Sequence, residues 1–218
     1  HGPLLVDNNL FLSPASLDVN SQGGAYVHNL ITGSVYVIHT EGRQTPYHPA
    51  HSTEVAGLAD NPSGDERFYN NIFVNGGLPA YDPATLPVFM AGNVFLHGAQ
   101  PSKHEPEPLV LPQVNPAVQL LEKPDGLYLA ITLDTAWSQP PRQVVTTERL
   151  GKAKIPDLPY EQPDGSPYRL DTDYFGHPRN PAHPFPGPFE WSAVSRQELK
   201  LWPPPRGAIK ATKPYFSY

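Results

Sequence analysis

An asparagine that precedes a short apolar segment recurs four times in the first half of the chain. The segments span residues 9–12, 29–32, 71–74 and 93–96, and their asparagines are separated by 20, 42 and 22 positions. Such a period is typical of a solenoid, whose coils stack short strands in register and can join equivalent asparagines into a side-chain ladder. The repeat therefore predicts coils of a right-handed parallel β-helix over residues 1–100. The alternative is four unrelated strands with asparagine in their turns.

The longest interval indicates that one coil carries an insertion, at about residues 42–64. Insertions in solenoids often carry the function. This one contains Arg43, His48, His51 and Glu54. Together these side chains offer the donors and acceptors that a sugar's hydroxyl groups need. The same residues also allow two other interpretations, a zinc or iron site built on the two histidines and the glutamate, or bonds that merely hold the loop to the coil beneath it.

The composition limits the classes of protein. A hydrophobic content of 39% is enough for a core, and 29 prolines with 17 glycines indicate many turns and short strands. A net charge of −6 argues against polyanion binding, and no apolar run approaches a membrane span, so we expect neither nucleic-acid nor membrane partners. The absence of cysteine excludes disulfides and thiolate metal sites. It leaves the compartment open between bacterial cytoplasm, periplasm and secretion.

The asparagine repeat stops near residue 100, and the remaining residues, 101–218, have a different pattern. Apolar and polar residues alternate over residues 127–134, which predicts a half-buried strand. Further short strands are expected at 144–147, 168–170 and 199–202, with no long helix. We therefore expect an all-β chain, in which a small β-sandwich or sheet cap with an extended proline-rich tail from residue 203 follows the coils.

Four motifs, in order along the chain, resemble the C-terminal third of the β-xylosidases of glycoside hydrolase family 120. They are HGPLLVDNN at residues 1–9, SQGGAYVHNLI at 21–31, HSTEVAG at 51–57 and DERFYNNIF at 65–73. The similarity continues through residues 163–165 and 170–174 to 200–202. It implies a parallel β-helix with a β-sandwich. It also implies retaining, exo-acting cleavage of xylose from xylo-oligosaccharides or aryl xylosides.

The resemblance also implies that the catalytic residues are missing from this chain. In the family, the nucleophilic aspartate and the acid/base glutamate lie on coils just before the segment that matches His1, the glutamate only a few residues before it. Asp7, Asp18, Glu41 and Glu54 match neither position. We therefore expect no catalytic residue, cofactor or metal here. The expected sugar-binding residues are Arg43, His48, His51 and Glu54, with Asp7 and His28 as weaker candidates at a coil corner.

The start of the chain also leads to an expectation about assembly. The chain opens on His1 and has its single methionine at Met90, so we expect that it derives from a longer polypeptide. An N-terminal fragment of the same enzyme should then stack on the first coil, and the chain alone should be inactive. Homo-oligomers are compatible with this arrangement.

Two other functions compete with a xylosidase fragment. A free N-terminal histidine binds copper in lytic polysaccharide monooxygenases, which makes His1 a candidate ligand. A non-catalytic carbohydrate-binding or structural solenoid is the other possibility. It would bind sugar through exposed aromatic residues such as Tyr47, Trp137 or Trp191.

Overall fold

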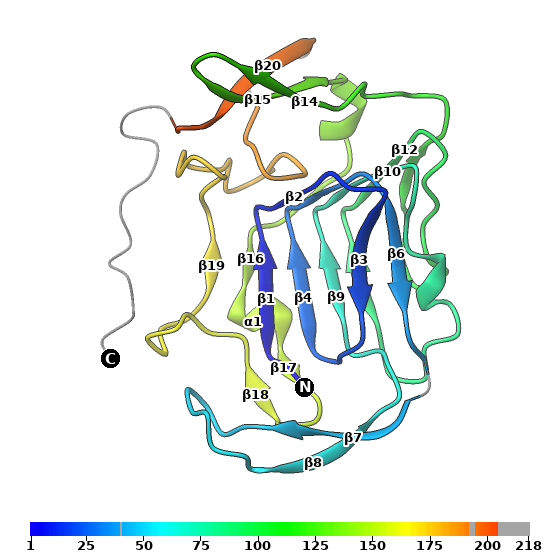
Figure 1. Ribbon diagram of the computed structural model, residues 1–218, viewed down its shortest axis with the longest axis vertical. Coiled ribbons are helices and arrows are strands. Elements are labelled where there is room, and N and C mark those ends of the chain that lie inside the picture. The colour runs from blue at the N-terminus through cyan, green and yellow to red at the C-terminus, as the bar shows by residue number, and fades with distance from the viewer. Residues whose placement is uncertain (40, 192–194, 205–218) are drawn as a thin grey trace.

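The computed structural model describes residues 1–39, 41–191 and 195–204, without the side chains of residues 41 and 43. This part of the chain is almost entirely β-structure (Figure 1). Its helices are the four-residue α1 (Thr147–Leu150) and the 3-10 turns η1 (Pro79–Tyr81) and η2 (Thr135–Ser138). The prediction of an all-β chain is confirmed.

The first half consists of three parallel sheets that the chain visits in turn. Sheet A has the order β1 (Leu4–Asp7), β4 (Gly24–Val27), β9 (Arg67–Tyr69) and β11 (Phe89–Ala91). Sheet B has the order β2 (Leu10–Phe11), β5 (Leu30–Ile31), β10 (Ile72–Val74), β12 (Val94–Leu96) and β13 (Leu109–Leu111). Sheet C pairs β3 (Ala15–Val19) with β6 (Ser34–Val37). The first strands, β1, β2 and β3, each lie at the edge of a sheet, so their outer backbone groups have no neighbouring strand among the described residues.

The asparagine ladder predicted from the sequence is confirmed. Asn29 Oδ1 accepts from the backbone and side-chain nitrogens of Asn9, at 2.9 and 3.2 Å. Asn71 Oδ1 does the same for Asn29, and Asn93 Oδ1 for Asn71, at 2.8–3.0 Å. At the far end the Glu105 carboxylate replaces an asparagine and accepts both Asn93 donors. The ladder therefore joins the starts of β2, β5, β10 and β12 to one another.

A second stack precedes the ladder, at the corner between sheets A and B. Asn8, His28, Asn70 and Gly92 occupy equivalent positions there, and all have positive φ, between 53° and 72°. Glycine enters this left-handed region freely, and asparagine and histidine enter it more readily than most residues. The corner residues thus supply the sharp bend that lets the apolar strand after each asparagine enter sheet B.

The interior of the coils is filled by apolar side chains that stack from coil to coil. Tyr26 lies on Phe68 with ring centroids 4.7 Å apart, and Phe73 lies on Phe95 at 5.2 Å. Strands β4, β9, β10 and β12 are buried on both faces, because the second half of the chain covers their outer sides. Double burial explains why β4, β10 and β12 read as short apolar runs rather than as alternating patterns.

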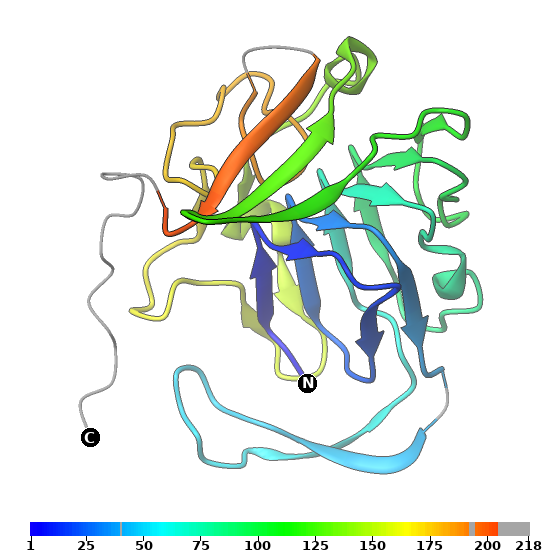
Figure 2. The same cartoon turned by 45° about the horizontal axis from the view of Figure 1, so that its top comes forward.

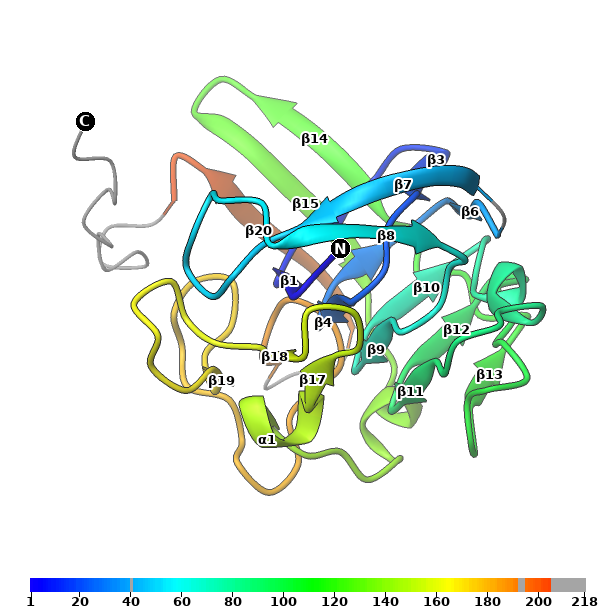
Figure 3. The same cartoon turned by 90° about the horizontal axis from the view of Figure 1, so that it is seen from below.

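The insertion forms an antiparallel hairpin of β7 (Glu41–Tyr47) and β8 (Gly57–Asn61), joined by the loop 48–56. Seen from below, the hairpin crosses the N-terminal end of the chain (Figure 3). His1 holds it there, because its Nε2 lies 2.7 Å from Thr45 Oγ1 and 3.1 Å from the Ala59 carbonyl oxygen. The insertion is therefore an ordered arm beside the first coil.

The second half contains one three-stranded antiparallel sheet, of β14 (Gln119–Lys123), β15 (Gly126–Thr132) and β20 (Arg196–Trp202) (Figure 2). Two further antiparallel pairs are β16 (Val145–Thr146) with β19 (Arg169–Leu170), and β17 (Lys152–Ala153) with β18 (Leu158–Pro159). The predicted strand at 144–147 is shorter than expected, because the Thr146 side chain accepts from Arg149 N and starts α1. The predicted tail lies outside the described residues from 205 onward.

The second half packs on the outer faces of sheets A and B. On sheet A, Tyr160 and Tyr168 join Ala25 and Val27 in a buried cluster. On sheet B, Trp137 and Phe175 join Leu30 and other strand residues in a larger one. This cover creates the pocket described below, at the edge of sheet A where β1 lies.

Candidate functional site

A pocket of about 630 Å³ opens beside β1. It is lined by residues 1–5 and Asp7 at the start of the chain, by the arm loop over residues 48–53, and by residues 158–163 with Tyr168. Three segments far apart in the sequence therefore meet at this one place. The volume falls within the range that holds small molecules, about 300–1,000 Å³.

Asp7 and Tyr168 form a buried polar pair on one side of the pocket. Asp7 lies at the end of β1, and its Oδ2 accepts a 3.0 Å hydrogen bond from the Tyr168 hydroxyl. Burial raises the pKa of Asp7, while the Tyr168 hydroxyl and the charge of Arg179 act in the opposite direction. Burial and the negative charge of Asp7 raise the pKa of Tyr168. The pair offers acceptor positions to a ligand hydroxyl at the pocket wall.

The arm loop supplies two imidazoles to the pocket, those of His48 and His51. His48 Nδ1 lies 2.8 Å from the Glu54 carbonyl oxygen, a bond within the loop. His51 Nε2 lies 3.1 Å from Glu161 Oε2 on the opposite wall, and both side chains are partly exposed. The pocket thus carries both donors and acceptors, as a polyhydroxyl ligand requires.

The structure brings together only some of the residues predicted from the sequence. Asp7, His48 and His51 line the pocket, whereas Glu54 does not, since its side chain is exposed on the loop. Arg43 is on β7, but its side chain lies outside the described residues. Sequence reasoning missed Glu161, which lies 110 positions from His51, as well as Tyr160 and Tyr168. These residues belong to the second half, and no local pattern indicates that they meet the arm.

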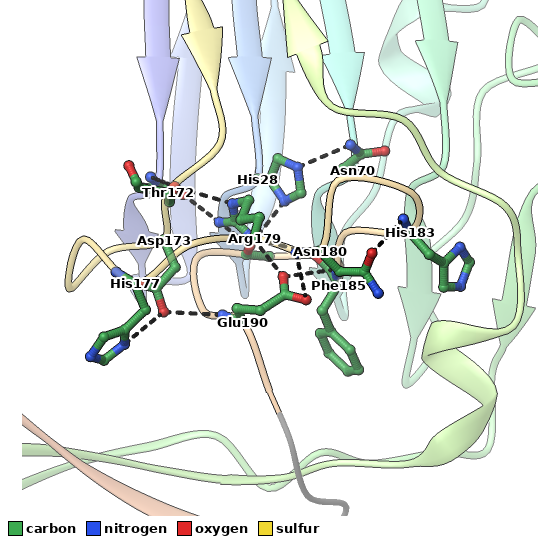
Figure 4. A network of polar contacts seen from close by, with 12 residues as sticks. His28, Asn70, Thr172, Asp173, His177, Arg179, Asn180, His183, Phe185 and Glu190 are labelled. Carbon is green, nitrogen blue, oxygen red and sulfur yellow. Dashed lines mark hydrogen bonds and ion pairs between the residues drawn. The ribbon is translucent and has the colours of Figure 1, made fainter.

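His28 lies in a buried network away from the pocket (Figure 4). Its Nδ1 is 3.2 Å from the Gly187 carbonyl oxygen, and its Nε2 is 3.0 Å from Asn70 Nδ2. This geometry suits a neutral ring that donates at Nδ1 and accepts at Nε2. Burial and the nearby Arg179 charge hold the pKa of His28 well below its usual range. His28 therefore makes a structural bond at a coil corner, the alternative that the sequence left open.

Arg179 is the centre of that network. Its guanidinium donates to Asn8 Oδ1 at 2.6 Å and to the Thr172, Phe185 and Gly187 carbonyl oxygens at 3.1–3.2 Å. Glu190 lies 3.6 Å away. Burial lowers the pKa of Arg179 to about 10, which still leaves it charged at neutral pH. Through the bond to Asn8, this network holds residues 172–190 against the corner that follows Asp7.

The structure does not bring a second histidine into contact with the His1 ring. Among the described residues, His1 bonds to Thr45, Pro46 and Ala59, all on the arm. No group of three histidine, cysteine, aspartate or glutamate residues with metal-binding geometry is found in the part of the chain that the structure describes. The copper and loop-metal interpretations therefore gain no support from the geometry.

The aromatic residues suggested for a sugar-stacking surface are not freely exposed. Trp137 is fully buried, and Trp191 packs against the cluster on sheet B. Tyr47 is partly buried, with its ring against Gly57. Trp137 was wrongly expected to be exposed. It is buried because η2 turns it into the core between the two halves. Within the described residues, no helix has the length and apolarity needed to cross a membrane.

Comparison with solved structures gives one informative similarity. The chain is similar to the structure described as the complex of XylC with xylose, with a TM-score of 0.86 and 33% sequence identity. The match covers 93% of this chain but only 36% of that chain, so this chain spans about a third of its length. No protein-family model matches the sequence. A search of curated proteins gave no match either.

Proposed function

We propose that this chain is the C-terminal part of a retaining, exo-acting β-xylosidase of glycoside hydrolase family 120. Its substrates are short xylosides, and its three parallel sheets are the last coils of a right-handed β-helix. The observation that carries the proposal is the similarity to XylC, whose structure holds xylose, over 93% of this chain. The pocket beside β1, with its hydroxyl, carboxylate and imidazole groups, is consistent with it.

We infer that the pocket forms one wall of the sugar site. Asp7, His48 and His51, together with Tyr168, would bind the hydroxyl groups of xylose. A glutamate a few residues before His1 must lie close to the pocket, because an extended chain advances at most about 3.3–3.6 Å per residue. His1 itself lines the pocket. The upstream acid/base residue would thus face the sugar from the side where β1 is open.

The spacing of coils is compatible with retaining chemistry. Adjacent strands of a sheet lie about 4.7–4.9 Å apart. Retaining glycosidases place their two carboxyl groups about 5–5.5 Å apart, one as nucleophile and one as acid/base. Two carboxylates on neighbouring upstream coils, pointing to the same side as Asp7, would meet that requirement. The proposal therefore does not require a catalytic carboxyl pair within this chain.

Assembly follows from the same proposal. The edges of β1, β2 and β3 and the half-exposed Leu4 side chain would be covered by the preceding coil. Uncovered strand edges favour aggregation. We therefore expect the chain to be stable only when its upstream part is stacked on the first coil. A monomeric chain with a cooperative melt in isolation would contradict this expectation.

The experiment compares the chain alone with the chain joined to its upstream sequence. The joined protein should release xylose from an aryl β-xyloside, and the first sugar product seen by proton NMR should be the β-anomer. The chain alone should release none, because the carboxyl pair is upstream. Turnover by the purified chain alone would overturn the catalytic assignment. Binding of xylose without turnover by the joined protein would favour a carbohydrate-binding module.

A further inference from the structure

Two walls of the pocket are connected by a single side-chain pair. Among the hydrogen bonds of the described residues, the one between His51 Nε2 and Glu161 Oε2, at 3.1 Å, joins the arm loop to the segment after β18. The other bonds of the loop are internal: Ser52 N donates to the Pro49 carbonyl oxygen, and Glu54 N to Ser52 Oγ. The loop is thus shaped locally, but its position over the pocket depends on His51.

The backbone of His51 is itself unusual. Its φ of 51° lies in the left-handed region, which residues other than glycine enter uncommonly, although histidine does so more readily than most. Such conformations persist when surrounding contacts hold them, and they cluster at ligand sites. On the opposite wall, a Cβ atom at Gly165 would lie 3.5 Å from His51 Nε2, so the glycine turn there sits directly beside the ring. Gly165, which has no side chain, therefore leaves room for the His51 ring.

We propose that Glu161 is a positioning residue for the sugar site, acting through His51. By accepting from Nε2, its carboxylate fixes the imidazole tautomer that carries the proton on Nε2. Nδ1 is then an acceptor, available to a hydroxyl of the sugar. The same bond holds loop 48–53 against residues 158–163. The inference rests on the proposed function, and it gives Glu161 a positioning role, distinct from the direct sugar contact that the sequence predicted for Glu54.

The test uses the chain joined to its upstream sequence, with four variants at the pair: Glu161→Ala, Glu161→Gln, His51→Ala and the double variant His51→Ala/Glu161→Ala. Glu161→Ala should lower kcat/KM for an aryl β-xyloside about tenfold, mainly by raising KM, because the acceptor that orients His51 is lost. Glu161→Gln should retain most of the activity, since the amide oxygen still accepts from Nε2–H. In a His51→Ala background, Glu161→Ala should have almost no further effect. Glu198→Ala removes an exposed carboxylate paired with Lys123 on the distant three-stranded sheet, and it serves as the control.

Hydrogen exchange separates this inference from the proposed function. Backbone amides of residues 50–53 should exchange several-fold faster in Glu161→Ala than in the wild type, with little change in melting temperature, and Glu161→Gln should restore protection. Unchanged exchange and unchanged kinetics in Glu161→Ala would overturn the role of Glu161, even if the joined protein cleaves xylosides. Faster loop exchange in a protein that neither binds nor cleaves xylosides would leave Glu161 as a loop clamp and reject the xylosidase assignment.

Discussion

The substitution Asn71→Ala should strongly destabilise the asparagine ladder. The Asn71 side chain accepts from the Asn29 backbone and side-chain nitrogens and donates to the Tyr26 carbonyl oxygen and Asn93 Oδ1. After truncation, the Asn29 backbone N–H and the Tyr26 carbonyl each lose a partner in a buried region. Each unsatisfied group costs about 1–3 kcal/mol, so the two together cost about 2–6 kcal/mol.

Asn9→Ala is the matched control. Asn9 is exposed and its side chain donates only to the Asp7 carbonyl oxygen and Asn29 Oδ1. Asn29 Oδ1 keeps the Asn9 backbone donor. Because the Asn29 acceptor is not left unsatisfied, we expect a cost of about 1 kcal/mol.

The assay is hydrogen exchange followed by mass spectrometry on peptides that cover β5 and β10. A loss of about 4 kcal/mol corresponds to opening roughly a thousand times more often, since each 1.4 kcal/mol is tenfold. Asn9→Ala should change exchange by less than about tenfold. Equal protection in the two variants would refute the reasoning, because it would mean that the ladder does not hold the coils together.

Three further outcomes are expected, each with its own measurement. Burial, reinforced by the charge of Asp65, raises the pKa of Glu66 to about 9, and burial raises that of Glu105 to about 7. The contribution of each protonated carboxyl to the free energy of unfolding should be complete below pH 4.5. It should decline as the pH rises to about 7 for Glu105 and to about 9 for Glu66, by up to about 1.4 kcal/mol per pH unit for each group. Denaturant titrations at pH 5, 7 and 9 would measure this decline. Glu66→Gln should remove the decline of the unfolding free energy above pH 7. An unchanged slope of unfolding free energy against pH in this variant would exclude Glu66 as the source of that decline. Gly33→Ala should lower the melting temperature far more than Gly42→Ala, because a Cβ at Gly33 would lie 2.3 Å from the Pro14 carbonyl oxygen and one at Gly42 would meet nothing within 4 Å.

The repeat made the asparagine ladder and the strands that follow it predictable from the sequence. Four asparagines at near-regular intervals each precede an apolar strand, and the structure stacks them as expected. The end of the ladder was not predictable, since Glu105 lies outside the repeat and shares only its ability to accept two N–H donors. The positive φ of Asn8, His28 and Asn70 was not predictable from the sequence either. No single residue type repeats at this corner, and the residues share only the backbone bend.

The candidate site was predictable on the side of the arm and, through Asp7, at the end of β1. His48 and His51 lie close together in sequence, so their local pattern indicated a polar loop. Glu161 and Tyr168 reach the same pocket through the packing of the second half on sheet A, which depends on buried contacts such as those of Tyr160 with the coil. Long-range packing of this kind leaves no periodic signal in the sequence. It also explains why the sequence indicated Glu54 and missed Glu161.

The position of bound xylose in the chain joined to its upstream sequence tests the central claim most directly. A crystal structure of that protein with xylose should place the sugar in the pocket beside β1, with hydroxyl oxygens within about 3.2 Å of Asp7 or Tyr168 and of His51. Two upstream carboxyl groups should flank its anomeric carbon. Xylose bound elsewhere, with the pocket filled by upstream side chains, would contradict the claim that this chain forms a wall of the sugar site.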